Sequence, residues 1–82
     1  MRLNDKVVVV TGGASGIGRA MARRFTSEGA KQVVIADLNA EGLQEVADEI
    51  GAHAIPINVS IEAEVKHLIE TAENDYGQID LL

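Results

Sequence analysis

The chain has 82 residues, a formal net charge of −6, no cysteine and one proline. That length accommodates one domain. The acidic balance argues against binding to nucleic acids or anionic membranes, which calls for clusters of Lys and Arg. No apolar run approaches the ~20 residues of a membrane span, and no signal-peptide pattern precedes the first apolar run, so we expect a cytoplasmic protein.

The first 30 residues change from strand periodicity to helix periodicity. Lys6 to Thr11 is a continuous β-branched run, which is typical of a buried parallel strand. Gly12 and Gly13 end it. Apolar residues then recur every fourth position, which predicts a helix from Gly16 to Gly29 with a glycine at its C-terminal end. The residues expected on its core-facing side include Ile17, Met21 and Phe25.

A second strand and helix follow with the same alternation. Gln32 to Asp37 is again apolar and β-branched, and it predicts the second strand. Asn39 is a suitable N-cap for a helix from Ala40 to Ile50, because its side chain can accept a bond from an unpaired N–H of the first turn. Gly51 stands where the left-handed residue after a helix is expected.

The third unit begins with His53 to Asn58, a strand that contains the single proline, Pro56. A central strand rarely accommodates proline, so this strand is expected at an edge of the sheet. Ser60 is predicted to cap a helix from about Ile61 to Tyr76. The residues from Ile79 onward resemble the start of a fourth strand.

Strands that alternate with helices of this length predict an α/β fold with a parallel sheet and right-handed crossovers. Three strands and the start of a fourth correspond to the N-terminal half of a Rossmann-type doubly wound sheet. The expected strand order is 3-2-1-4. We therefore assign residues 1–82 to one partial Rossmann domain, and we expect the chain to be a fragment that stops at the fourth strand.

The segment Thr11 to Gly18 (Thr-Gly-Gly-Ala-Ser-Gly-Ile-Gly) is the most informative part of the sequence. It joins the first strand to the first helix, at the edge of a parallel sheet where ligands bind. Glycines allow close approach of a ligand to the main chain, and a helix N-terminus attracts phosphate groups. The alternative is a glycine-rich turn that binds nothing.

Two kinds of phosphate site could be built on this turn. Gly13 to Gly18 has the G-x-x-x-x-G spacing of a P-loop, but Lys and Ser/Thr should follow it. The residues present are Arg19 and Ala20, so a nucleoside-triphosphate site is disfavoured. The dinucleotide pattern G-x-G-x-x-G is not met literally either, and that interpretation depends on the flanking strand, the flanking helix and a downstream acid.

The downstream acid is Asp37, which ends the second strand 19 positions after Gly18. An acid about 20 residues beyond the glycines binds the ribose hydroxyls of NAD, and its charge would repel the 2′-phosphate of NADP. Neither Leu38, Asn39 nor Ser15 is basic, so we favour NAD over NADP. A second role for Asp37, at the start of the following helix, is compatible with the first.

Together these residues resemble the short-chain dehydrogenase/reductase family, whose T-G-x-x-x-G-I-G segment is similar to Thr11–Gly18. The resemblance extends over the whole chain, and it implies an NAD(P)-dependent oxidoreductase that is a homo-oligomer when complete. It also implies that the ribose-binding acid is Asp37. The other residues that it places around the cofactor are Gly12, Ser15, Gly16, Ile17, Gly18, Leu38, Asn58 and Val59.

The chain departs from that family in two ways. Where the family usually has Asp at the end of the third strand, this chain has Asn58, whose side-chain oxygen could accept a bond from the adenine amino group. The family's catalytic Ser and Tyr-x-x-x-Lys pair are absent, because the single tyrosine, Tyr76, is followed four positions later by Asp80. We therefore name no catalytic residue.

No metal site is expected, because His53 and His67 are isolated and a metal needs three or four converging ligands. The favoured function is the cofactor-binding N-terminal portion of an NAD(H)-dependent oxidoreductase, which transfers hydride between nicotinamide and an alcohol or ketone. Two alternatives remain: a truncated dinucleotide-binding module without catalysis, and a remnant without function.

Overall fold

A computed structural model describes residues 6–58 and 60–81 of the chain. Strands and helices alternate throughout this part, as the periodicity predicts. The elements are β1 (Val7–Thr11), α1 (Gly16–Ser27), β2 (Gln32–Asp37), α2 (Ala40–Ile50), β3 (His53–Pro56), α3 (Glu62–Tyr76) and β4 (Asp80–Leu81).

The strands form a parallel sheet in the order β3-β2-β1-β4, which confirms the predicted Rossmann-type topology. Pro56 is the last residue of β3, and β3 is an edge strand, as the proline predicts. The register pairs Thr11 with Ala36, and Asp37 with Pro56. The carboxyl ends of β1, β2 and β3 therefore lie along one edge of the sheet, which is where the glycine turn begins.

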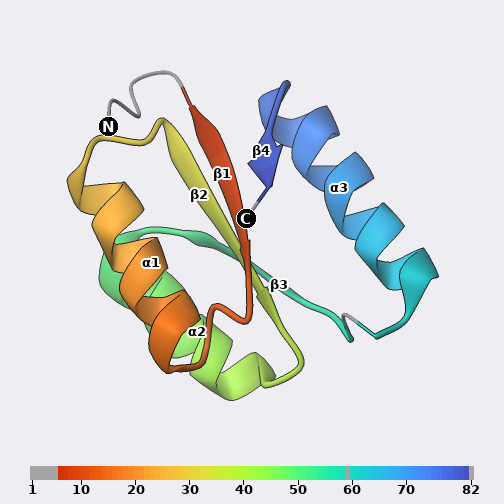
Figure 1. Cartoon of the computed structure of the whole chain (residues 1–82), viewed down its shortest axis with the longest axis horizontal. Coiled ribbons are helices and arrows are strands. Elements are labelled where there is room, and N and C mark those ends of the chain that lie inside the picture. The colour runs from red at the N-terminus through yellow and green to blue at the C-terminus, as the bar shows by residue number, and fades with distance from the viewer. Residues whose placement is uncertain (1–5, 59, 82) are drawn as a thin grey trace.

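The sheet separates two apolar layers, with α1 and α2 on one face and α3 on the other (Figure 1). The side chains of β1 alternate between these layers. Val8 and Val10 pack in the layer with α1 and α2, whereas Val7 and Val9 pack in the layer with α3. Each of the four valines is at most 2% exposed. Burial on both faces explains why β1 is a continuous apolar run.

Helix α2 begins and ends at the residues that the sequence predicts. The Asn39 side chain accepts a hydrogen bond of 3.1 Å from the N–H of Gly42, so it caps the first turn. Gly51 follows the helix with φ of 73°, in the left-handed region that favours glycine. Helix α1 ends slightly earlier than predicted, at Ser27, and Gly29 lies just beyond it with φ of 87°.

The predicted cap at Ser60 is wrong. Helix α3 begins at Glu62 and has Ile61 in the N-cap position, with no side-chain bond to the first turn. The Ser60 hydroxyl instead donates a bond of 2.6 Å to the side-chain oxygen of Asn58. The Glu64 carboxylate reaches back beyond the helix and accepts a bond of 3.1 Å from the main-chain N–H of Asn58.

The end of α3 is attached to the start of β3 by a polar contact inside the apolar layer. His53 Nδ1 lies 2.8 Å from the Tyr76 hydroxyl, and the two rings meet edge to face with centroids 5.9 Å apart. Burial, with a smaller contribution from Asp75, raises the pKa of Tyr76 above its usual value of 10.0. Tyr76 therefore packs against the apolar layer on the α3 side of the sheet.

Candidate functional site

The turn between β1 and α1 is held against the end of β2 by main-chain hydrogen bonds. The N–H groups of Gly12 and Gly13 both donate to the carbonyl of Ala36, over 2.7 and 3.2 Å. The turn is closed by a bond of 3.1 Å from the N–H of Ser15 to the carbonyl of Gly12. These bonds fix where helix α1 starts relative to the sheet edge.

Gly12 and Gly18 are two of the glycines in this segment that the protein itself requires. Gly12 has φ of 73°, which side chains rarely tolerate. A Cβ on Gly18 would lie 2.6 Å from the carbonyl carbon of Gly12, so only glycine allows α1 to pack this closely on the turn. The contact is between the first turn of α1 and the main chain of the glycine turn.

Gly16 differs from both, because no protein atom explains its lack of a side chain. A Cβ built on Gly16 would meet nothing within 4 Å, and its φ is not positive. Gly16 is the first residue of α1 and is exposed. The absent side chain therefore leaves open space directly in front of the helix N-terminus.

That N-terminus offers unpaired N–H donors. The first main-chain bond into α1 runs from Arg19 N–H to the carbonyl of Ser15, over 2.7 Å. Ser15 occupies the N-cap position but makes no capping bond, since its hydroxyl donates to the carbonyl of Gly12 over 3.0 Å. The N–H groups of residues 16–18 precede that first bond, and together with the helix dipole they form an anion-binding arrangement.

Asp37 lies beside this helix end and is half-buried. One carboxylate oxygen, Oδ2, accepts a bond of 3.0 Å from the N–H of Ala14 in the turn. The other, Oδ1, accepts a bond of 3.1 Å from the N–H of Asn39. The contact with Ala14 joins residues 23 positions apart. This hydrogen bond was not predicted from the sequence. The strand order, which places the end of β2 next to the turn after β1, is the signal that could have indicated it.

Two large apolar side chains at this edge face outward. Ile17 is 80% exposed and Leu38 is 71% exposed. The expectation that Ile17 shares the core-facing side of α1 with Met21 and Phe25 is wrong. The buried residues of α1 are Gly18, Ala22 and Phe25, and Ile17 lies off the side of the helix that they form. Exposed apolar side chains beside unpaired N–H groups suit a ligand with both flat apolar and charged parts.

Asn58, beyond the end of β3, has a side-chain oxygen that is already engaged. It accepts bonds of 3.0 Å from the N–H of Ser60 and 2.6 Å from its hydroxyl. Both lone pairs of that oxygen are thereby used, so the side-chain NH2 group is what remains for a ligand. Val59, the other residue expected at this position, lies outside the described residues.

The arginines that follow the turn face another partner. Arg23 contacts Glu49 of α2 through Nε at 3.0 Å and through its terminal NH2 group at 2.6 Å. Arg19 lies 3.7 Å from the same carboxylate. This bridge between α1 and α2 was not predicted, because it depends on how the two helices pack. It directs both guanidinium groups toward Glu49.

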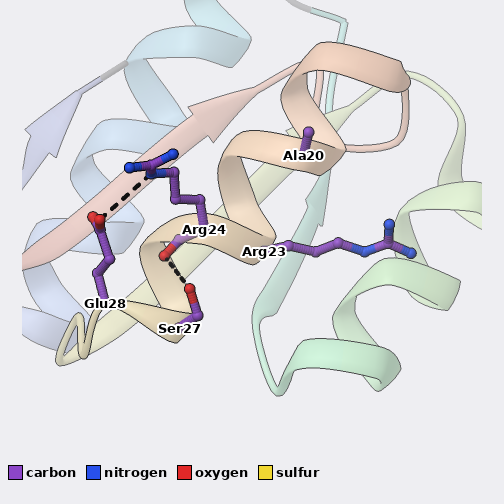
Figure 2. Close-up of a pocket in the computed structure, with 5 residues that line it drawn as sticks. All are labelled: Ala20, Arg23, Arg24, Ser27 and Glu28. Carbon is purple, nitrogen blue, oxygen red and sulfur yellow. Dashed lines mark hydrogen bonds and ion pairs between the residues drawn. The ribbon is translucent and has the colours of Figure 1, made fainter.

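A hollow on the outer side of α1 is separate from the glycine turn (Figure 2). In the close-up, Arg24 is paired with Glu28 at 3.4 Å and Arg23 extends toward α2. None of the residues expected at the cofactor site belongs to it. The residues that line it are Ala20, Arg23, Arg24, Ser27 and Glu28.

We predict that Glu49→Gln weakens the pH dependence of stability on the acid side. The hydrogen bond from Arg23 is the main cause that lowers the pKa of Glu49 below its usual 4.5. A carboxyl whose pKa is lower in the folded state stabilises the fold above the unfolded value, and this contribution disappears as the pH falls through the folded value. Urea unfolding between pH 2 and 7 should therefore show a shallower acid limb in the variant.

The control for that experiment is Glu45→Gln, which removes an exposed carboxylate from the same helix. Because Glu49 is exposed, the difference should shrink in 1 M salt. An acid limb of unchanged slope in Glu49→Gln would contradict the assignment.

Two kinds of feature are absent from the described part of the chain. Residues 6–58 and 60–81 contain no group of three or more His, Cys, Asp or Glu side chains placed to hold a metal ion. Within the same ranges, no helix is both long and apolar enough to cross a membrane.

Comparison with known proteins defines the class of this chain. The model of the short chain dehydrogenase family matches residues 6–82. The chain therefore belongs to the short-chain dehydrogenase family, as its glycine turn predicts.

Particular relatives agree with that assignment. The chain is 47% identical to (+)-cis,trans-nepetalactol synthase NEPS1 of Nepeta racemosa, over 99% of this chain and 31% of that protein. It is 41% identical to the 3-hydroxyacyl-CoA dehydrogenase type-2 of Drosophila melanogaster, over 96% of this chain and 31% of that protein. It thus spans about a third of these curated relatives.

A solved structure has the same fold. The 3-ketoacyl-(acyl-carrier-protein) reductase of Brucella melitensis, complexed with NADH, superposes with a TM-score of 0.89 at 44% identity. The match covers 96% of this chain and 34% of that one. The relation therefore extends to three-dimensional structure as well as to sequence.

Proposed function

We propose that this chain supplies the NAD(H)-binding N-terminal part of an oxidoreductase, which transfers hydride between nicotinamide and an alcohol or ketone carbon. The observation that carries the proposal is the N-terminus of α1. It combines unpaired N–H donors with open space in front of Gly16, where no packing contact within the protein requires a glycine. The relative of known structure that is complexed with NADH supports the same class of ligand.

The residues present fit a dinucleotide. The main-chain N–H groups of Gly16, Ile17 and Gly18 would bind the pyrophosphate, because they carry the positive end of the helix dipole. Gly12 and Ser15 shape the turn that aims them. Asp37 would bind the adenosine ribose, since each of its oxygens retains one lone pair after the bonds to the main chain.

Two exposed positions complete the proposed site. Leu38, 71% exposed next to Asp37, offers an apolar surface to the adenine. Asn58 would approach the other side of the base through its side-chain NH2 group, because its oxygen is engaged by Ser60. Val59 is proposed beside it on the basis of the family resemblance alone.

The charge at the ribose position favours NAD over NADP. A carboxylate at Asp37 accepts hydrogen bonds from ribose hydroxyls and repels a 2′-phosphate. Neither Leu38, Asn39 nor Ser15 carries a positive charge that could offset this repulsion. Arg19, the first arginine after the glycine turn, is directed toward Glu49.

The bound cofactor supplies the hydride-transfer chemistry, and the residues of this chain bind and orient it. No residue here is proposed to act on the substrate. The chain covers about a third of its curated relatives, so the substrate and the proton-transfer groups are properties of the longer proteins.

The test is binding of NAD to the purified chain, followed by thermal unfolding and calorimetry. We expect millimolar NAD to raise Tm by several degrees, because a ligand that binds only the folded state stabilises it. NADP should bind at least about tenfold more weakly, equivalent to about 1.4 kcal/mol. Asp37→Ala should abolish that preference, whereas the exposed control Asp48→Ala should keep it. No shift of Tm at millimolar NAD would refute the proposal.

A further inference from the structure

Four consecutive main-chain N–H groups hold the glycine turn in place. Three of them donate to main-chain carbonyls, and the fourth donates to a side chain. The N–H groups of Gly12 and Gly13 donate to the Ala36 carbonyl, and that of Ser15 donates to Gly12. The N–H of Ala14 donates to Asp37 Oδ2 at 3.0 Å. Three of the four bonds therefore have main-chain acceptors, and the fourth exists because position 37 is an acid.

We propose that Asp37 is a positioning residue for the glycine turn as well as a ligand of the ribose. By fixing Ala14, the carboxylate holds the segment that immediately precedes the free N–H groups of residues 16–18. The affinity for the diphosphate part of a ligand then depends on Asp37, although no ribose hydroxyl is involved. This inference rests on the proposed function, because it concerns the same site.

A carboxylate suits this role better than its amide. The bonds to Ala14 and Asn39 use one oxygen each, at 3.0 and 3.1 Å. In Asp37→Asn one of these oxygens becomes an NH2 group, which is a donor and cannot accept from a main-chain N–H. One of the two N–H groups then loses its partner, while the shape and volume of the side chain stay almost the same.

Electrostatics predicts the opposite effect on a diphosphate, and this makes the proposal testable. Asp37 carries a negative charge close to the proposed phosphate site, so its neutralisation alone would strengthen the binding of an anion. If the carboxylate acts only on the ribose hydroxyls, a ligand without those hydroxyls should bind the variant equally or more tightly. If it holds the turn, the same ligand should bind more weakly.

The first measurement uses the unaltered chain and amide hydrogen exchange followed by NMR, without cofactor. We expect the Ala14 amide to exchange at least about tenfold more slowly than the Gly16 amide, because Ala14 is bonded to Asp37 and Gly16 precedes the first helical bond. Equal exchange at the two positions overturns the proposal, whether or not any variant folds.

The second measurement compares ligand affinities in Asp37→Asn and in the control Asp48→Asn, which removes the same charge from an exposed site on α2. The probe is the 5′-diphosphate of 2′,3′-dideoxyadenosine, which has no ribose hydroxyls. We expect its affinity to fall about five- to tenfold in Asp37→Asn and to stay unchanged in Asp48→Asn, with faster exchange at Ala14 only in the former.

Unchanged or tighter binding of the probe by Asp37→Asn overturns the positioning role. Slow exchange at the Val9 amide, in the buried centre of β1, shows that the variant is folded. NAD binding by the unaltered chain is measured in parallel. If NAD fails to bind there, the proposed function fails, whereas NAD binding with an unaffected probe rejects the positioning role alone.

Discussion

Replacement of Gly16 by valine is expected to weaken NAD binding at least about 100-fold while leaving the fold intact. The valine side chain would occupy the open space in front of α1 and keep a phosphate away from the N–H groups behind it. Loss of two hydrogen bonds to a charged group costs about 3 kcal/mol, which corresponds to roughly that factor. Calorimetric titration with NAD measures the effect.

Stability provides the control for Gly16→Val. A Cβ at this position meets no protein atom within 4 Å, and glycine is a poor helix former. The free energy of unfolding should therefore stay the same or rise by a few tenths of a kcal/mol. Normal NAD affinity in a well-folded Gly16→Val chain would show that the ligand does not approach the helix end.

Replacement of Gly18 by alanine, two residues further on, should have the reverse effect on stability. The new Cβ would lie 2.6 Å from the carbonyl carbon of Gly12 and 3.2 Å from the N of Gly13. Main-chain atoms cannot rotate away, so α1 must move outward from the turn. We expect the free energy of unfolding to fall by about 3 kcal/mol, which is the upper part of the range for overpacked sites.

Urea unfolding of both glycine variants side by side tests this contrast. Gly16→Ala is the matched partner of Gly18→Ala, because each adds one methyl group to the first turn of the same helix. A small domain is only marginally stable, so a loss of this size should shift the unfolding midpoint strongly. Equal midpoints for the two alanine variants would contradict the close packing at Gly18.

The features that the sequence predicts well are those set by neighbouring residues. The alternation of apolar residues gives the order of strands and helices, Asn39 and Gly51 give the ends of α2, and Pro56 gives the edge strand. Each of these signals depends on residues a few positions apart. The same holds for Gly18, whose contact with Gly12 lies within the turn itself.

The contacts that could not be predicted from the sequence depend on packing between elements that are distant along the chain. Arg23 meets Glu49 across 26 positions, and His53 meets Tyr76 across 23. No local pattern reports such contacts. The wrong cap at Ser60 has a local cause. Helix α3 begins at Glu62 with Ile61 in the N-cap position, and the Ser60 hydroxyl donates to the side-chain oxygen of Asn58, two positions away.

The position of Ile17 shows where periodicity fails at a functional end of a helix. The spacing places Ile17 on the apolar side of α1, but a side chain is buried only where something covers it. The buried residues of α1 are Gly18, Ala22 and Phe25, so in the first turn the core-facing position is that of Gly18 and not that of Ile17. Periodicity alone therefore does not predict whether an apolar residue in the first turn of such a helix is buried.

The hydrogen bonds and packing that hold β1 affect the thermodynamics of ligand binding. This strand is hydrogen-bonded to β2 and β4 at its two edges and packed between apolar layers on its two faces. The glycine turn therefore starts from a strongly restrained strand. Little main-chain entropy remains to be lost when a ligand settles there, so a larger share of the contact energy becomes affinity.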